Sequence, residues 1–119
     1  MSDARQFVYK VLPRSEWHDA CRTGSYAGSA DDRRDGFIHL SLREQLPGTL
    51  SKHFRGQGDL VLVQFVTDTL GDALRWEASR GGALFPHLYA PLPTDNASAV
   101  HDLQLIDDVP VLPKEFSVC

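Results

Sequence analysis

The sequence has few cysteines, no excess of positive charge and no long apolar run, and each absence excludes a class of protein. Two cysteines among 119 residues give no disulfide framework, so Cys21 and Cys119 are expected to be free thiols. The formal net charge of −4 gives no general attraction to nucleic acid or to an anionic membrane. No segment approaches the roughly 20 apolar residues of a membrane helix, and the first residues lack a signal-peptide apolar stretch. We therefore expect a cytoplasmic protein.

Several common catalytic and cofactor motifs are also missing. The chain contains no G-x-G-x-x-G, no P-loop and no C-x-x-C, so Rossmann cofactor binding, nucleotide-triphosphate hydrolysis and a zinc ribbon have no support. No G-x-S-x-G is present, which removes the nucleophile elbow of a serine hydrolase. The five histidines match no zinc-ligand spacing, so no metal site is expected.

What remains is the composition of one ordinary globular domain. Of its residues, 42% are hydrophobic and 24% are charged. We expect a single domain over residues 1–119, with an ordered core over about 5–107 and a loosely held tail over 108–119. Two short helices early in the chain and five or so strands predict an α+β fold with a mainly antiparallel sheet.

The first third of the chain is predicted from its alternation and its turn residues. A strand over residues 7–13 ends at Pro13. A short helix follows, with Ser15 as its N-cap and Gly24 as its C-cap. The polar, glycine-rich stretch over 24–36 is expected to be a long loop.

The next segments combine helix signals with further strands. Ser41 and Glu44 have the spacing of a capping box, and a helix is expected to restart with Pro47 near its first position and to run to Phe54. Pro86 argues for an edge or bulge position of the segment around it. The other strands are expected over 36–41, over 59–67 as a central strand buried on both faces, over 74–77, and over 98–106.

The strand "FIHLS" carries a histidine in the middle of an apolar run. Because side chains alternate along a strand, Phe37, His39 and Ser41 share one face, and Ile38 and Leu40 share the other. The apolar pair is the natural core face, so His39 and Ser41 face solvent, a loop or a cleft. Two interpretations stay open: a half-exposed histidine beside a helix-capping serine, or one wall of a pocket.

A second polar and aromatic segment runs over residues 75–92 around a Gly-Gly pair. This composition is common at ligand sites, because backbone approaches a ligand closely at glycine. The alternative is ordinary packing, with Trp76 in the core and a surface pair between Glu77 and Arg80. The alternation does not decide whether Arg75 and Glu77 point inward or outward. The candidate residues here are Arg75, Glu77, Arg80, His87 and Tyr89.

Six separated blocks resemble, in order and spacing, a small bacterial family called domain of unknown function 952. These blocks are "YKVLPRSEW", "DGFIHLS", "TLSKHF", "DLVLVQF", "LRWEASRGG" and "FPHLYAPL", and the resemblance covers roughly residues 7–106. It implies an ADP-ribosyltransferase-like fold. Such a fold has a split β-core of mainly antiparallel strands, flanking helices and a cleft for a nicotinamide dinucleotide.

The same resemblance implies roles for individual residues. In the diphtheria-toxin-like transferases, a strand histidine holds the ribose next to nicotinamide, and a Ser or Thr two residues later contacts the carboxamide; His39 and Ser41 match this pattern. One branch, which includes the tRNA 2′-phosphotransferases, has histidine at the next motif position, and His87 with Tyr89 nearby matches it. His39 and His87 are thus the candidate catalytic residues. The late glutamate of these transferases has no counterpart, since Glu77 precedes His87.

The residues lead to two hypotheses from different classes, and they leave open whether the chain is an enzyme. In the first, it binds a nucleotide-like small molecule, with NAD or ADP-ribose as candidates, and performs glycosidic or phosphoryl transfer on it. Lys10, Arg75 and Arg80 would then form a clamp for a pyrophosphate. In the second, the fold is a non-catalytic ligand-binding or protein-interaction module. The ligand-binding candidates are Ser41, Lys10, Arg75, Glu77, Arg80 and Tyr89.

Overall fold

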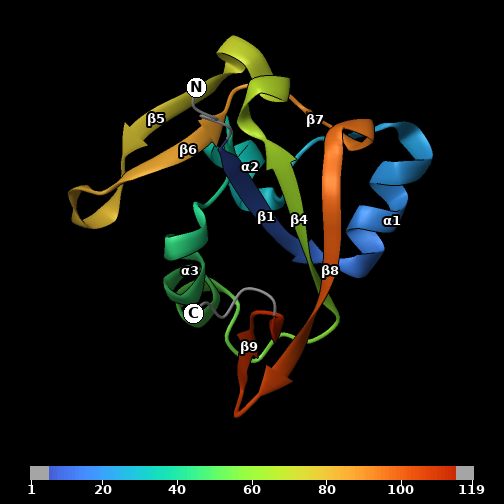
Figure 1. Ribbon diagram of the computed structural model, residues 1–119, viewed down its shortest axis with the longest axis vertical. Helices are drawn as coiled ribbons and strands as arrows, with labels where there is room; N and C mark the ends of the chain where they lie inside the picture. Colours follow the sequence, from blue (N-terminus) through green and yellow to red (C-terminus); the bar gives the residue numbers. More distant parts are fainter. Residues whose placement is uncertain (1–5, 115–119) are drawn as a thin grey trace.

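The computed structural model describes residues 6–114, apart from the side chain of Arg80. A four-stranded antiparallel sheet lies at its centre, with the strand order β1-β4-β8-β9 (Figure 1). Strand β1 (Phe7–Pro13) pairs with β4 (Leu60–Val66), β4 pairs with β8 (Ala97–Ile106), and β8 pairs with β9 (Val109–Val111). The most hydrophobic run of the sequence therefore forms an interior strand, as its composition predicts.

A second sheet has three strands in the order β3-β6-β5. These are β3 (Ile38–His39), β6 (Leu84–Leu88) and β5 (Leu74–Ala78). The two sheets meet at Ser41, whose backbone N–H and carbonyl both bond to Tyr9 of β1 at 2.9 Å. The short stretch from Ile38 to Ser41 therefore joins both sheets.

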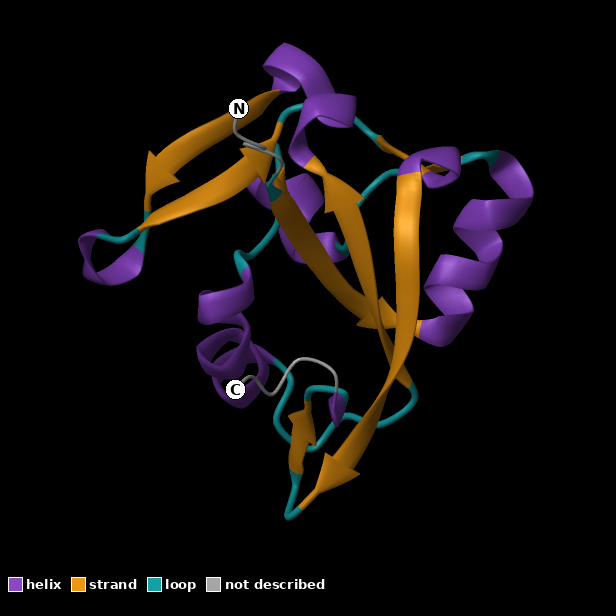
Figure 2. Cartoon of the chain, in the orientation of Figure 1, coloured by secondary structure: helices purple, strands orange, loops and turns teal. Residues whose placement is uncertain are grey.

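Helix α1 (Arg14–Thr23) follows β1 directly and lies on the opposite side of the molecule from the β5–β6 hairpin (Figure 2). It ends at Gly24, whose φ of 96° is left-handed, as the sequence predicts. The predicted N-cap at Ser15 is wrong, because the helix begins at Arg14 and Pro13 occupies the cap position, two residues earlier than predicted. Trp17 is buried in this helix and packs edge-on against Phe65 of β4.

The two faces of the central sheet are covered by different elements. Val8, Leu12, Val61, Val63 and Phe65 belong to the core shared with α1, β3 and β6. Tyr9, Val11, Leu60, Leu62 and Leu103 belong to the core shared with helix α3 (Leu46–His53), which buries Leu46 and Leu50. Alternation along β1 and β4 thus supplies both cores.

The predicted loop over 24–36 contains regular structure instead. Strand β2 (Ser25–Tyr26) pairs with β7 (Leu92–Pro93), and helix α2 (Ala30–Asp35) follows. The helix begins with a capping box, in which Ser29 Oγ accepts from Asp32 N and Asp32 Oδ2 accepts from Ser29 N. The prediction is wrong because glycines are typical of loops, whereas in the structure Gly24 and Gly36 are the C-caps of α1 and α2.

A second capping prediction is wrong by one residue. The capping interaction uses Leu42 and Gln45, with Gln45 Oε1 accepting from Leu42 N at 2.9 Å, rather than Ser41 and Glu44. The Ser41 hydroxyl lies 3.0 Å from Thr49 Oγ1 instead. The short 3-10 segments are η1 (Arg43–Gln45), η2 (Thr67–Ala73), η3 (Arg80–Gly82) and η4 (Thr94–Asn96).

Two further expectations are corrected at strands β6 and β9. Pro86 lies in the middle strand of its sheet rather than at an edge, and it takes part through its carbonyl, which accepts from Leu40 N at 3.0 Å. The expected end of the ordered core at residue 107 is too early, because Val109–Val111 pair with β8 and Pro110 is buried. No helix in residues 6–114 is both long enough and apolar enough to cross a bilayer.

Candidate functional site

One face of the second sheet gathers polar and aromatic side chains, and we call it the histidine face. His87 in β6 lies opposite His39 in β3 and, on its other side, opposite Arg75 in β5. Directly opposed residues of antiparallel strands point to the same side of the sheet. By alternation along each segment, the histidine face consists of Phe37, His39, Arg75, Glu77, Phe85, His87 and Tyr89.

His39 lies between two carboxylates, both supplied by helix α2. Its Nδ1 is 2.6 Å from Asp32 Oδ1, and its Nε2 is 3.0 Å from Asp35 Oδ2. The His39 side chain is 40% exposed, so the ring is anchored at both nitrogens and still reaches solvent. On the other face of this strand, Ile38 and Leu40 are buried, as the alternation predicts.

The carboxylate of Asp32 is buried, and both of its oxygens accept hydrogen bonds. Its Oδ2 accepts from Lys10 Nζ at 2.8 Å and from Ser29 N, and its Oδ1 accepts from the His39 backbone N–H as well as from the ring. Burial raises the pKa of Asp32, but the bond from His39 and the charge of Lys10 outweigh burial and hold the pKa well below its usual range. The carboxylate is therefore ionised.

Lys10 is buried behind this carboxylate. Its side chain is 8% exposed, and its Nζ also donates to the carbonyl oxygen of His39 at 3.0 Å. Burial lowers the pKa of Lys10, and the charge of Asp32 opposes that shift. The expected contact of Lys10 with a ligand phosphate does not fit this position, because the side chain is buried and its Nζ already bonds to Asp32 and to the carbonyl of His39. Lys10 instead fixes Asp32 and the backbone at His39.

His87 has a carboxylate of its own. Its Nδ1 is 2.7 Å from Glu77 Oε1, which also accepts from the Tyr89 hydroxyl at 2.7 Å. The bonds from His87 and Tyr89 lower the pKa of Glu77, and the bond to Glu77 raises the pKa of Tyr89. No described residue pairs with Nε2 of His87, and residues 6–114 contain no fully buried side-chain nitrogen without a partner. The His87 side chain as a whole is only 7% exposed, so Nε2 is narrowly open to solvent.

The two histidines are neighbours, and aromatic rings connect them. Their ring centroids are 5.7 Å apart, and Phe37 stacks on His87 at 4.1 Å and contacts His39 at 4.6 Å. The Arg75 guanidinium lies 5.0 Å from the centre of the Tyr89 ring. Two imidazoles, each held at Nδ1 by a carboxylate, are equipped for acid–base chemistry. Within the described residues, no three His, Cys, Asp or Glu side chains are grouped so as to hold a metal.

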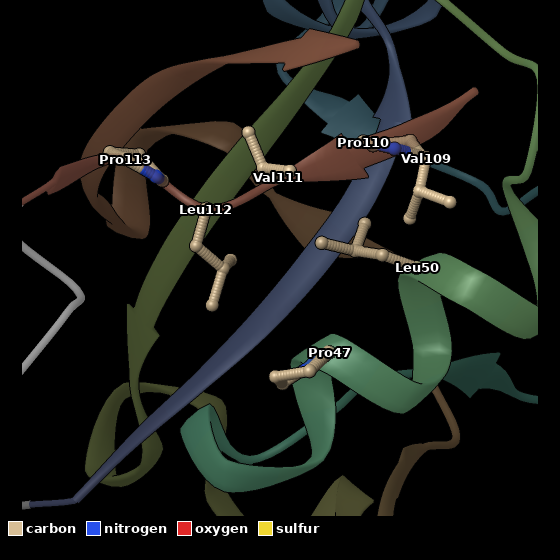
Figure 3. Close-up of a pocket in the computed structure, with 7 residues that line it drawn as sticks. All are labelled: Pro47, Leu50, Val109, Pro110, Val111, Leu112 and Pro113. Atoms are coloured by element: carbon tan, nitrogen blue, oxygen red, sulfur yellow. The ribbon is translucent and has the colours of Figure 1, made fainter. Parts of the chain in front are cut away.

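A pocket of about 220 Å³ opens beside the histidine face. Its lining includes the aromatic rings of Phe37 and Tyr89 and the side of α2 that carries Asp32 and Arg33. A larger pocket of about 350 Å³ lies elsewhere, between α3 and β9, and Figure 3 shows that its lining residues are prolines, leucines and valines. Because that lining offers no group for chemistry, the smaller pocket is the candidate ligand site.

The structure brings five of the eight residues expected at the site onto one face: Arg75, His39, Glu77, His87 and Tyr89. Glu77 and Arg75 point toward this face, and Trp76 is exposed on the other, which settles the phase of that strand. Ser41 is buried against Thr49, so its hydroxyl is not open to a ligand at this face. The side chain of Arg80 lies outside the described residues, so its role stays a prediction. Asp32 and Asp35 were missed, although "SADD" is a helix-start pattern that could have located Asp32.

Gly28 packs against the carboxylate that holds His39, and replacing it tests this contact. A Cβ at Gly28 would lie 2.8 Å from the Asp32 Cβ, and its φ of +107° is left-handed. We expect Gly28→Ala to lower the free energy of unfolding by about 2–4 kcal/mol, from strain and displacement of Asp32 together. Gly24→Ala is the control, because its φ of +96° is similar and no atom lies within 4 Å. Equal losses in urea unfolding would show that the Asp32 contact contributes nothing.

Comparisons with known proteins identify relatives but no activity. A family model described as "Protein of unknown function (DUF952)" matches residues 11–100. The crystal structure of Protein CC0527 from Caulobacter crescentus is 49% identical with a TM-score of 0.89, covering 94% of this chain and 99% of that one. The solution NMR structure of CC0527 is 51% identical with a TM-score of 0.79, covering 87% and 90%. No curated protein matches the chain.

Proposed function

The chain belongs to the DUF952 family of proteins of unknown function, and from its histidine face we propose that it binds a nucleotide-like small molecule and catalyses transfer chemistry on it. One observation carries this proposal: two imidazoles lie 5.7 Å apart, and each is held at Nδ1 by a carboxylate. A carboxylate at Nδ1 fixes the tautomer and directs Nε2 toward a substrate. Two such groups side by side can give one proton and take another in a single displacement.

The surroundings of the histidines fit the parts of a nucleotide. A flat heterocycle fits the pocket of about 220 Å³ beside Phe37 and Tyr89, where it stacks on an aromatic ring. The sugar and phosphates then lie over His39 and His87, and Arg75 on the same face is a cation for a phosphate. NAD and ADP-ribose remain the candidate ligands.

A distant relation to ADP-ribosyltransferases is part of this proposal. It is supported by a histidine on a short strand, since the resemblance implies a strand histidine; in this chain the strand lies where two sheets meet. Ser41 departs from the pattern, because its hydroxyl is buried on Thr49 and is not presented to a ligand. Binding of nicotinamide through Ser41 is therefore not part of the proposal.

A second candidate function is binding without catalysis. The observation that favours it is the contact between Asp35 and Nε2 of His39, which occupies the nitrogen that chemistry would need. In this alternative the histidines only recognise the ligand. Both candidates predict binding at the histidine face, and only the first predicts turnover.

Thermal unfolding with NAD, ADP-ribose and nicotinamide tests binding. A ligand at about a hundredfold its dissociation constant stabilises the folded state by about 2.7 kcal/mol, which is several degrees for a domain of this size. We expect NAD or ADP-ribose to produce this shift in the wild type and not in His39→Ala. His18→Ala is the matched control, since His18 is exposed on α1. If none of the three ligands shifts the wild type, nucleotide binding is wrong.

A further inference from the structure

We propose that the two histidines are held in complementary protonation states, His39 as the acid and His87 as the base, and that together they hydrolyse a phosphorus–oxygen bond of a nucleotide phosphoanhydride or phosphodiester. This inference rests on the proposed function and deepens it by naming the reaction and the class of substrate. It is argued from hydrogen-bond geometry and from the positions of the carboxylates.

Each ring nitrogen of His39 faces a carboxylate oxygen. Asp32 lies 2.6 Å from Nδ1 and Asp35 lies 3.0 Å from Nε2, and an ionised carboxylate only accepts hydrogen bonds. Both contacts are attractive only when both nitrogens carry a proton, which is the imidazolium form. The charged groups that face His39 are Asp32 and Asp35 from α2 and Lys10 from β1, with the imidazole of His87 from β6. The two carboxylates, which contact the ring itself, favour the cation.

His87 differs because one carboxylate holds only one of its nitrogens. Glu77 accepts from Nδ1, so a neutral His87 ring has its lone pair on Nε2. The stacked ring of Phe37 covers one side of this imidazole. His87 thus presents a lone pair on the same face on which His39 presents an N–H.

The carboxylates of the face argue for phosphoryl rather than glycosidic chemistry. Glycoside cleavage usually needs a carboxylate free to stabilise the developing charge on the sugar or to attack it. Here Asp32 is buried and accepts four bonds, and Glu77 binds His87 and Tyr89. Asp35 binds Arg34 as well as His39. Displacement at phosphorus requires only a base, an acid and a cation, and His87, His39 and Arg75 supply these on one face.

The proposed hydrolysis needs only the two histidines, the substrate and one water molecule. His87 Nε2 removes a proton from a water molecule, whose oxygen forms a bond to phosphorus. The bond from phosphorus to the leaving oxygen breaks, and that oxygen takes the proton from His39 Nε2, with Asp35 displaced by the substrate. A proton then passes from His87 back to His39 through solvent. With NAD as the substrate, the products are AMP and nicotinamide mononucleotide.

Nitrogen-15 NMR of the histidine rings tests the protonation states without any ligand. At pH 7 we expect both nitrogens of His39 to have protonated shifts, and Nε2 of His87 to have an unprotonated one. Asp35→Ala should move Nε2 of His39 toward the unprotonated shift. Asp31→Ala should not, because Asp31 lies on the same helix and, among the described residues, pairs with Arg34 rather than with His39. Identical patterns in the two wild-type histidines would overturn the assignment.

Product analysis tests the bond that is cleaved, using NAD and bis(4-nitrophenyl) phosphate. We expect AMP with nicotinamide mononucleotide from NAD, and 4-nitrophenol from the diester, at rates that fall about a hundredfold or more in His39→Ala and His87→Ala and stay unchanged in His18→Ala. NAD that binds and stays intact, or that yields nicotinamide, overturns the inference and leaves nucleotide binding standing. If the diester is cleaved but NAD does not bind, the acid–base pair stands, and the nucleotide falls as its substrate together with the proposed nucleotide binding. If neither occurs, both fall.

Discussion

Asp32→Ala is expected to lower the free energy of unfolding by about 3–5 kcal/mol, because it leaves the buried charge of Lys10 without its counterion. The side chains of Lys10 and Asp32 are only 8% and 2% exposed, so water does not replace the lost carboxylate. The substitution also removes the bond to Nδ1 of His39 and the cap on α2. Urea unfolding followed by circular dichroism measures the loss.

Two variants separate the charge effect from the loss of the helix cap. Lys10→Met combined with Asp32→Ala should recover most of the stability, because no unpaired charge then remains in the core. Asp31→Ala should change stability by no more than about 0.5 kcal/mol, because that carboxylate is exposed on the same helix. If the double variant is no more stable than Asp32→Ala, the pair is not what stabilises this part of the fold.

The sequence predicts those parts of the fold that depend on the pattern of apolar residues along a single strand. The residues from Leu60 to Val66 are nearly all apolar, and such a strand is stable only in the interior of a sheet. Its place between two other strands therefore follows from its composition. The alternation in "FIHLS" places Ile38 and Leu40 in the core whatever the partner strand. His39 could therefore be assigned to the opposite face before any partner strand was known.

The parts that the sequence does not predict depend on long-range partners. Lys10 looks like a surface cation, because nothing in its own strand indicates that α2 supplies Asp32 as its buried partner. Glu77 and His87 meet only through the register of β5 and β6, and a shift of one residue would separate them. Proline is usual at the edge of a sheet because it has no N–H to donate. Pro86 nevertheless lies in a middle strand, where its carbonyl oxygen accepts a hydrogen bond from Leu40 N.

Acidification is expected to unfold the protein mainly through Asp32. The pKa of this carboxyl is lower in the folded chain than the value of about 3.9 in an unfolded one. Its contribution to stability is therefore complete above about pH 4, where the carboxyl is ionised in both states. Below that pH the unfolded chain binds the proton first, and stability falls by up to about 1.4 kcal/mol per pH unit until the folded carboxyl is protonated too. Asp35 and Glu77, whose pKa values are also lowered, act in the same direction.

Urea unfolding from pH 6 down to pH 2.5 measures this dependence in the wild type and in the double variant Lys10→Met with Asp32→Ala. The wild-type curve should fall more steeply below about pH 4, because only the wild type has the buried carboxylate whose protonation breaks an ion pair. The difference between the two curves then gives the contribution of Asp32 alone, since Asp35 and Glu77 are present in both proteins. Parallel curves would show that Asp32 is not ionised and paired in the folded protein, which would also remove the anchor proposed for His39.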